Sequence, residues 1–151
     1  MSPGIGIAGS AALLAAAFGF QHIGGLDPCS LCVWQRWPHV AAILCGLLFV
    51  RYRHPVFCVM AMLGLLAGTG IAGFHAGVEQ GWWAGLQSCS GGMSDTLSGG
   101  DLLDFTAQVD VVSCSDVVWS FMGLSMAVWN GLASLVLALI WMTVSVRNRP
   151  A

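Results

Sequence analysis

Charged residues are scarce in this chain of 151 residues, and lysine is absent altogether. Only 8% of the residues are charged, against about 25% in soluble proteins, whereas 57% are hydrophobic. So few charges cannot cover a water-facing surface, which argues against an ordinary soluble protein. The arginines form no basic patch and the formal net charge is −2, so nothing points to nucleic-acid binding. The lipid bilayer is therefore expected to be most of this protein's solvent.

Four apolar stretches are long enough to cross a bilayer as helices. Charged or turn-forming residues bound each of them, which places the spans at about residues 5–22, 33–50, 56–75 and 128–146. In water, four buried helices would need more polar sequence around them than this chain contains, so a soluble bundle is the lesser alternative. The sequence predicts an all-α fold: an integral membrane four-helix bundle that forms a single domain over residues 1–151.

The first apolar stretch has a second interpretation, as a cleaved signal peptide. Its "AALLAAAFGF" run has the small, apolar character of the central part of such a peptide. It lacks the basic segment that precedes that part in signal peptides. Residues 5–22 are therefore expected to stay in the protein as a membrane span.

The arginines predict how the spans are oriented. Two of them follow the second span and two follow the fourth: Arg51, Arg53, Arg147 and Arg149. Both groups fall on one side of the membrane, which the positive-inside rule makes cytoplasmic, and the acidic residues fall on the other side. Both termini are then expected in the cytoplasm, with a short external segment around residues 24–32 and a long one over residues 76–127.

The long external segment ends in "DVVWSFMGLSM", residues 116–126, which combines apolar bulk with few polar residues. This composition predicts a short amphipathic helix that lies on the membrane surface before the last span. The alternative is that these residues simply extend the fourth span.

The six cysteines fall into two groups on this topology. Cys45 and Cys58 lie within spans, where cysteine is usually a small buried hydrophobic residue. The other four lie on the external side, where thiols can become oxidised and stay so. They are Cys29, Cys32, Cys89 and Cys114.

The external cysteines suggest two pairs. Cys29 and Cys32 form a C-x-x-C motif, a spacing that is more often redox-active than structural. Cys89 and Cys114 would close a Gly- and Asp-rich loop, either as a structural staple or as a mobile disulfide that is presented to another protein. The loop contains little apolar sequence to staple, which favours the second role without excluding the first.

Arg36 follows Cys32 by four positions, which places it on the same helical face, one turn deeper in the membrane. An arginine at the external end of a span runs against the positive-inside rule, and a charge at this depth is a functional candidate. It can stabilise a Cys32 thiolate and bind a carbonyl oxygen of a ligand, or it can snorkel to lipid phosphate. His22 and His75 end the first and third spans, each either as an interfacial residue or as a donor to a ligand.

The stretch "FQHIGGLDPCSLCVWQR" resembles the first external segment of the disulfide bond formation protein B (DsbB) family, in which an arginine follows a C-x-x-C pair by four residues. The resemblance continues in "SCSDVVWSFMGLSMAVWN" and covers essentially the whole chain. The ordered set of pair, arginine, second pair and "FMGLSM" run is specific, whereas the C-x-x-C motif alone is not. Gln35 departs from relatives with an acidic residue before the arginine, which removes a salt-bridge partner for Arg36.

The resemblance implies a protein-dithiol:quinone oxidoreductase of the bacterial inner membrane, with its redox cysteines on the periplasmic side. A reduced thioredoxin-like partner of the DsbA type would attack the Cys89–Cys114 disulfide at Cys89. Electrons would then pass through Cys114 and Cys29, leaving a thiolate on Cys32.

The resemblance also implies a membrane quinone, ubiquinone or menaquinone, as the electron acceptor beside Cys32. Arg36 and His75 would line the quinone site, and His22 lies in the matching "FQH" run.

Three other functional classes stay open at this stage. A metal-binding or transport protein would use cysteine and histidine ligands, but these lack compact zinc spacing and the spans lack buried carboxylates, so no metal is expected. A relay in the reverse direction, as in the vitamin K epoxide reductase family, is chemically close, although that family places its C-x-x-C late in the chain. A non-enzymatic four-span scaffold would tolerate replacement of Cys32.

Overall fold

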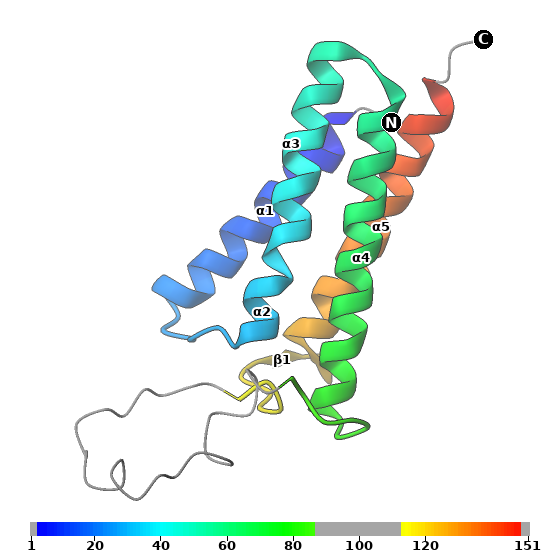
Figure 1. Ribbon diagram of the computed structural model, residues 1–151. Helices are drawn as coiled ribbons and strands as arrows, with labels where there is room; N and C mark the ends of the chain where they lie inside the picture. The colour runs from blue at the N-terminus through cyan, green and yellow to red at the C-terminus, as the bar shows by residue number, and fades with distance from the viewer. Residues whose placement is uncertain (1–2, 87–112, 149–151) are drawn as a thin grey trace, which may run out of the picture.

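The computed structural model describes residues 3–86 and 113–148, in which long helices form a bundle (Figure 1). In chain order the elements are α1 (Pro3–His22), α2 (Ser30–Trp34), α3 (Arg36–Tyr52), α4 (Pro55–Glu79), β1 (Ser120–Phe121), β2 (Leu124–Ser125) and α5 (Met126–Arg147). The start of α1 and the end of α5 lie at one end of the bundle, and α2 and the strands lie at the other (Figure 1). Cys89 and much of the predicted long external segment lie outside the described residues.

In the part of the chain that the structure describes, four helical stretches are long and apolar enough to cross a membrane, which agrees with the predicted four-helix membrane fold. They are Pro3–His22, Ser30–Tyr52, Pro55–Glu79 and Met126–Arg147. The second stretch begins before the predicted boundary and includes Cys32, and the third continues past His75 to Glu79. Both extensions lie at the end of the bundle that carries α2, and they bring polar side chains onto the ends of the spans.

Local sequence explains where the helices begin and end. Arg53 adopts a left-handed conformation (φ 56°) that ends α3, and Pro55 occupies the first turn of α4, where its missing N–H costs nothing. The His54 side chain accepts a hydrogen bond from the Val56 N–H at 3.3 Å. The Ser125 hydroxyl caps α5 in the same way. Because α3 ends at Tyr52 and α4 begins at Pro55, the link between them is short and the two helices run antiparallel.

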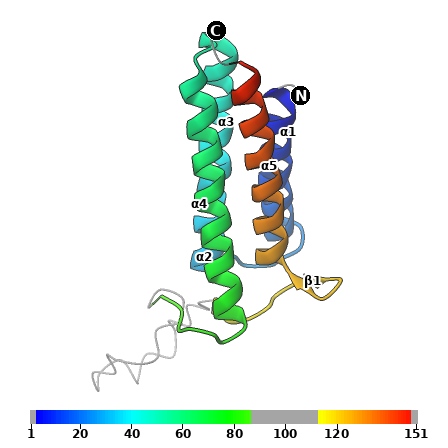
Figure 2. The same cartoon turned by 90° about the vertical axis from the view of Figure 1, so that its right-hand side faces the viewer.

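The packing between helices depends on small residues. Helix α4 runs beside α3 and α5 (Figure 2). Trp141 of α5 is fully buried, and a Cβ atom at Gly6 or Gly46 would lie within 2.7 or 2.9 Å of its indole ring. Only glycine at these positions leaves room for the ring, as is usual where membrane helices approach closely.

The distribution of apolar side chains matches a protein surrounded by lipid. Large ones are exposed on the outer faces of the helices, among them Leu44, Leu47, Leu63, Val136 and Leu139. Cys58 is fully buried in the core and Cys45 packs against it, in agreement with their predicted role as small hydrophobic residues.

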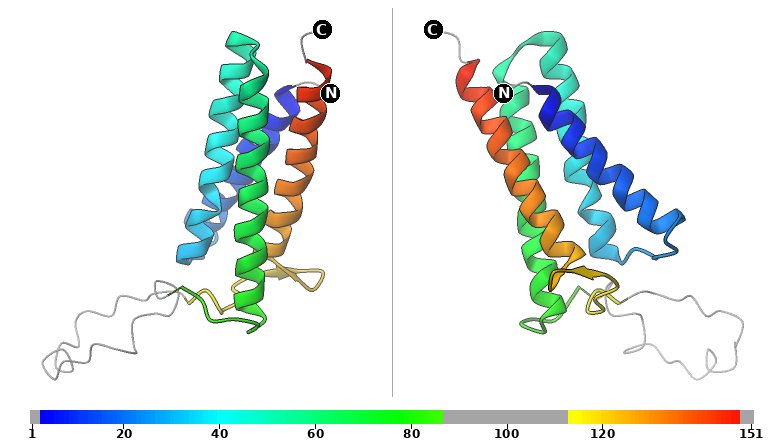
Figure 3. Two further views of the ribbon diagram at one scale, coloured as in Figure 1. Left: turned by 45° about the vertical axis from the view of Figure 1, so that its right-hand side comes forward. Right: turned by 180° about the vertical axis from the view of Figure 1, so that it is seen from behind.

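The predicted amphipathic helix over residues 116–126 is wrong, because the structure has a β-hairpin there (Figure 3). Strands β1 and β2 pair with Phe121 opposite Leu124, so the turn consists of Met122 and Gly123. Both turn residues have positive φ, 53° and 78°, the conformation that two-residue hairpin turns require and for which glycine is suited. A helix could not accommodate these two conformations, so the turn decides the structure of the segment.

Candidate functional site

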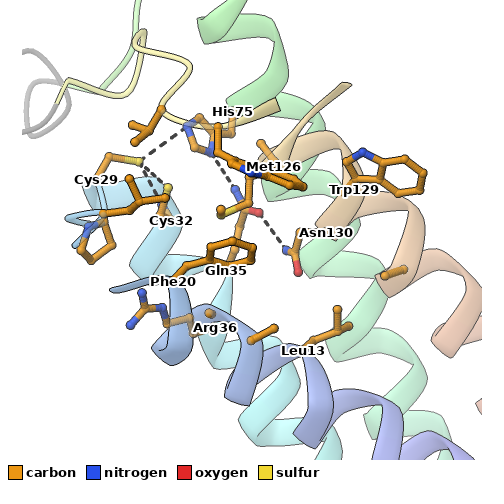
Figure 4. Close-up of a pocket in the computed structure, with 18 of the residues that line it drawn as sticks. Leu13, Phe20, Cys29, Cys32, Gln35, Arg36, His75, Met126, Trp129 and Asn130 are labelled. Atoms are coloured by element: carbon orange, nitrogen blue, oxygen red, sulfur yellow. Dashed lines mark hydrogen bonds between the residues drawn. The ribbon is translucent and has the colours of Figure 1, made fainter. Parts of the chain in front are cut away.

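A cavity of about 410 Å³ opens at the end of the bundle that carries α2 and the hairpin. Its wall is mostly apolar and includes Leu13 and Phe20 of α1 and Met126 and Trp129 of α5 (Figure 4). Several polar side chains converge on the same space, namely Cys29, Cys32, Gln35, Arg36, His75, Glu79 and Asn130. An apolar cavity with a few convergent polar groups is the usual form of a small-molecule site.

The C-x-x-C pair lies at the start of α2 as two free thiols. A hydrogen bond joins the Cys29 and Cys32 thiols, with 2.8 Å between the two Sγ atoms, and Cys32 is the donor when Cys29 is the thiolate. Cys29 precedes the first residue of α2, so its sulfur also accepts a hydrogen bond from the Cys32 backbone N–H at 3.2 Å. The short helix therefore directs two donors at one sulfur atom.

These donors favour the anionic form of Cys29. The hydrogen bond from the Cys32 thiol has the largest effect, and further hydrogen bonds from His75 and from the Cys32 N–H act in the same direction against the opposing effect of burial. Together they lower the pKa of Cys29 from its ordinary value of 9.0 to about 4. The lowered pKa favours a thiolate on Cys29 in the reduced pair, whereas the family resemblance implies a thiolate on Cys32.

Cys114 lies beside this pair although it comes from a distant part of the chain. Its Sγ atom, the Cys29 Sγ atom and a ring nitrogen of His75 all lie within 4.8 Å of one another. Cys114 is fully buried and disulfide-bonded. The fold thus places a thiolate-forming cysteine next to an oxidised one, which is the arrangement that thiol–disulfide exchange needs.

His75 stands at the centre of the polar groups and is 3% exposed. Its Nε2 atom lies 3.6 Å from the Cys29 sulfur and 3.9 Å from Glu79 Oε1. Its Nδ1 atom lies 2.7 Å from Gln35 Nε2, and the Gln35 carbonyl accepts a hydrogen bond from Asn130 at 2.8 Å (Figure 4). The side chain is therefore held from both ring nitrogens.

The other two predicted quinone-site residues, Arg36 and His22, lie apart from the hydrogen bonds around Cys29. Arg36 lines the cavity, but its guanidinium turns towards α1, where it donates a hydrogen bond to Gln21 at 2.8 Å and lies 4.9 Å from the centre of the Phe18 ring. Among the hydrogen bonds of the described segments, Arg36 is joined to Gln21 rather than to Cys32. His22 is exposed, stacks on Phe18 and does not line the cavity.

Three residues of the site were not identified from the sequence, namely Gln35, Glu79 and Asn130. In the sequence Gln35 stands out only as a missing salt-bridge partner for Arg36, yet its side chain is buried and hydrogen-bonded on both sides. The Glu79 side chain is 6% exposed and accepts a hydrogen bond from Ser125. Asn130 was detectable, since it is a polar residue in an apolar span, and such residues are functional candidates.

Comparison with known proteins places the chain among disulfide bond formation proteins. The family model described as "Disulfide bond formation protein DsbB" matches residues 2–144. Disulfide bond formation protein B of Xylella fastidiosa (strain Temecula1) is 31% identical over 144 residues, which cover 87% of this chain and 81% of the relative. The protein of the same name from Methylococcus capsulatus is 35% identical over 127 residues, 79% and 77% of the two chains. The one from Azoarcus sp. (strain BH72) is 32% identical over 152 residues, 92% and 89%.

Proposed function

Because this chain belongs to the DsbB family and is a disulfide-forming oxidoreductase with four apolar membrane helices, we propose that it carries electrons from a periplasmic dithiol to a membrane quinone. The donor is a thioredoxin-like protein of the DsbA type, and the membrane is the bacterial inner membrane. The arginines after α3 and α5 support cytoplasmic termini, and the cavity then opens on the periplasmic side.

The observation that carries the proposal is the proximity of the Cys29 and Cys114 sulfur atoms. A partner thiolate that attacks Cys89 of a Cys89–Cys114 disulfide forms a mixed disulfide with Cys89 and leaves the electron pair on Cys114. The Cys114 thiolate then attacks Cys29 of an oxidised Cys29–Cys32 pair, which forms a Cys29–Cys114 bond and leaves the electron pair on Cys32.

The cycle closes by two further exchanges. The second thiol of the partner displaces Cys89 from the mixed disulfide, and the partner leaves oxidised. The freed Cys89 thiolate attacks Cys114, which restores the Cys89–Cys114 disulfide and releases Cys29 as a thiolate. Two electrons and two protons have then moved from the partner to the Cys29–Cys32 pair.

The cavity suits a flat ring with an apolar tail, because its wall is largely aliphatic and aromatic and its polar groups are gathered beside the cysteines. A quinone bound there would accept the two electrons of the reduced Cys29–Cys32 pair. Arg36 lines the same space and supplies N–H donors for a carbonyl oxygen, and His75 lines it beside Cys29. His22 does not line the cavity and is left out of the proposed quinone site.

The test is anaerobic quinone reduction by the purified, quinone-loaded protein supplied with a reduced thioredoxin-like donor. Cys32→Ala and Cys89→Ala should each abolish turnover. Cys45→Ala and Cys58→Ala remove thiols from the spans and should retain it. Failure of the intact protein with several donors, in the presence of either quinone, would remove the oxidase function and leave the cysteines with structural or metal-binding roles.

A metal site is the second candidate, because Cys29, His75 and Cys114 have the spacing of three metal ligands. Cysteine binds metal as a thiolate, and Cys114 is disulfide-bonded in this structure, so it offers no thiolate until it is reduced. Metal analysis of the purified protein before and after reduction distinguishes the two functions, since the relay needs no bound metal in either state.

A further inference from the structure

A continuous series of hydrogen bonds crosses the bundle and ends at the Cys29 sulfur. It begins on α5, where Asn130 Nδ2 donates to Gln35 Oε1 at 2.8 Å. Gln35 Nε2 then lies 2.7 Å from Nδ1 of His75 on α4. The last contact is between His75 Nε2 and the Cys29 sulfur, 3.6 Å apart (Figure 4). Side chains from α5, from the turn between α2 and α3, and from α4 thus form a path that ends at a redox cysteine.

The direction of these bonds follows from the groups that can donate. His39 Nε2 lies 3.1 Å from the Asn130 carbonyl oxygen, which can only accept, so the Asn130 amide nitrogen is turned towards Gln35. The Gln35 carbonyl receives that hydrogen bond, which leaves the Gln35 amide nitrogen to donate to His75 Nδ1. A nitrogen that accepts carries no proton, so the proton of neutral His75 is on Nε2, the atom that faces Cys29.

We propose that Gln35 and Asn130 are positioning residues that hold His75 in the tautomer and orientation in which its Nε2–H donates to the Cys29 sulfur. Within the described segments their side-chain hydrogen bonds run to each other, to His39 and to His75 rather than to Cys29, so they act on Cys29 through His75. The consequence for turnover rests on the proposed function, because an anionic Cys29 is the group that leaves Cys114 when the relay cycle closes. The effect on Cys29 itself does not depend on a quinone or a partner.

Other ionisable groups around His75 bear on this proposal. On its own helix Glu79 offers a competing acceptor 3.9 Å from Nε2, and the Ser125 hydroxyl donates to the other oxygen of that carboxylate. Cys32 from α2 and Cys114 from the segment before the hairpin complete the set near the ring, with Arg36 on the same cavity wall and His39 at the far end of the series. Glu79 Oε1 and a backbone hydrogen bond with Cys114 are the other partners within reach of the ring.

A purely structural role for Gln35 is the competing explanation, since a buried amide also fills space between α4 and α5. The two explanations differ in whether His75 is needed. If Gln35 acts through His75, its replacement affects Cys29 only while His75 is present. If it only fills space, its replacement affects Cys29 equally with or without the imidazole.

The experiment measures the pH dependence of alkylation at Cys29 in the fully reduced, full-length protein in detergent, with the modified peptide quantified by mass spectrometry. Gln35→Met keeps the length of the side chain and removes its hydrogen bonds. We expect it to shift the midpoint of Cys29 alkylation upward by about one pH unit, the size expected for loss of one hydrogen bond to a charged group. The same substitution in a His75→Ala background should produce no shift. Equal shifts in the two backgrounds, or no shift in either, would overturn the proposal.

Asn130→Leu provides a second variant that keeps the volume of its side chain. It should shift the midpoint upward by a smaller amount, because Gln35 can still reach His75, and the shift should vanish when Gln35→Met is also present. Thr69→Val is the matched control, since it removes a hydroxyl on α4 whose hydrogen bonds go to backbone carbonyls at Leu65 and Gly131. A shift in the control as large as that of Asn130→Leu would contradict a specific series. If the wild-type protein does not reduce quinone, the proposed function is wrong, but the alkylation profiles still test the role of Gln35 and Asn130.

Discussion

The sulfur atoms of Cys29 and Cys114 lie within 4.8 Å of each other, with a ring nitrogen of His75 at the same distance or closer. A disulfide needs its two sulfur atoms about 2.05 Å apart, so a movement of a few ångströms converts this contact into a bond. Cys29 is held by α2, and Cys114 stands before the hairpin that leads into α5. The two sulfur atoms meet because both segments pack at the same end of the bundle.

This proximity predicts a bond that can be trapped. In a Cys32→Ser, Cys89→Ser double variant the proposed disulfide partners of Cys29 and Cys114 are missing, so mild oxidation should join Cys29 to Cys114. Peptide mapping under non-reducing conditions identifies the bond. A Cys45→Ser, Cys58→Ser variant is the control and should give no such cross-link. If the double variant keeps both thiols free after oxidation, the two sulfur atoms do not come close enough for thiol–disulfide exchange.

The lowered pKa of Cys29 predicts a pH-dependent stability of the reduced protein. Because the pKa falls from 9.0 in a free thiol to about 4, the hydrogen bonds to the thiolate stabilise the folded state fully above pH 9.0. That contribution decreases as the pH falls from 9.0 and is lost near pH 4. Thermal unfolding of the reduced protein at pH 5 and pH 8, compared with Cys29→Ser, measures it. The difference between the two midpoints should be smaller in Cys29→Ser, and an identical difference would refute the assignment.

Arg36 is predicted to bind the electron acceptor from the α1 side of the cavity. Arg36→Met should raise the apparent KM for quinone about tenfold, equivalent to ~1.4 kcal/mol, because a charged hydrogen-bond donor is lost. Gln21→Leu removes the partner that orients the guanidinium and should have a smaller effect in the same direction. Steady-state kinetics at fixed donor concentration gives both values. An unchanged KM in Arg36→Met would show that the guanidinium serves only to join α3 to α1.

The packing of α4 predicts that alanine at two nearby glycine positions has different effects on the stability of the protein. A Cβ atom at Gly68 would lie 2.9 Å from the Cβ of Pro38, a rigid side chain, whereas a Cβ at Gly70 would meet nothing within 4 Å. Gly68→Ala should therefore lower the free energy of unfolding by about 1–3 kcal/mol. Gly70→Ala should leave it unchanged or raise it by up to about 1 kcal/mol, since alanine favours helix. Unfolding in mixed detergent measures both, and equal losses would show that the helices do not pack as described.

The sequence predicted the membrane helices because their signal is local. Scarce charge and four long apolar runs are properties of consecutive residues, and a helix satisfies its own backbone hydrogen bonds in lipid wherever its neighbours lie. The same argument failed for residues 116–126, where apolar composition predicted a helix and the positive φ angles of Met122 and Gly123 make a hairpin. A two-residue turn outweighed the composition of the whole segment.

The candidate site was predictable only where its residues lie in a short motif. The spacing of Cys29, Cys32 and Arg36 identified these three residues, which line one side of the cavity, as site candidates. Gln35, Glu79 and Asn130 had no such signal in common, because they lie in the turn before α3, on α4 and on α5 and acquire their roles only when these segments pack together.

The sequence by itself therefore determined that this chain enters a membrane as four helices with oxidisable cysteines towards one side. Tertiary structure alone decided that Cys114 and His75 meet Cys29, that Arg36 turns to Gln21, and that Gln35 reaches His75. The physical reason is that solvent preference and helix formation depend on neighbouring residues in the chain. A shared hydrogen bond or a sulfur–sulfur contact depends on the rotation and depth of helices that are distant in the sequence.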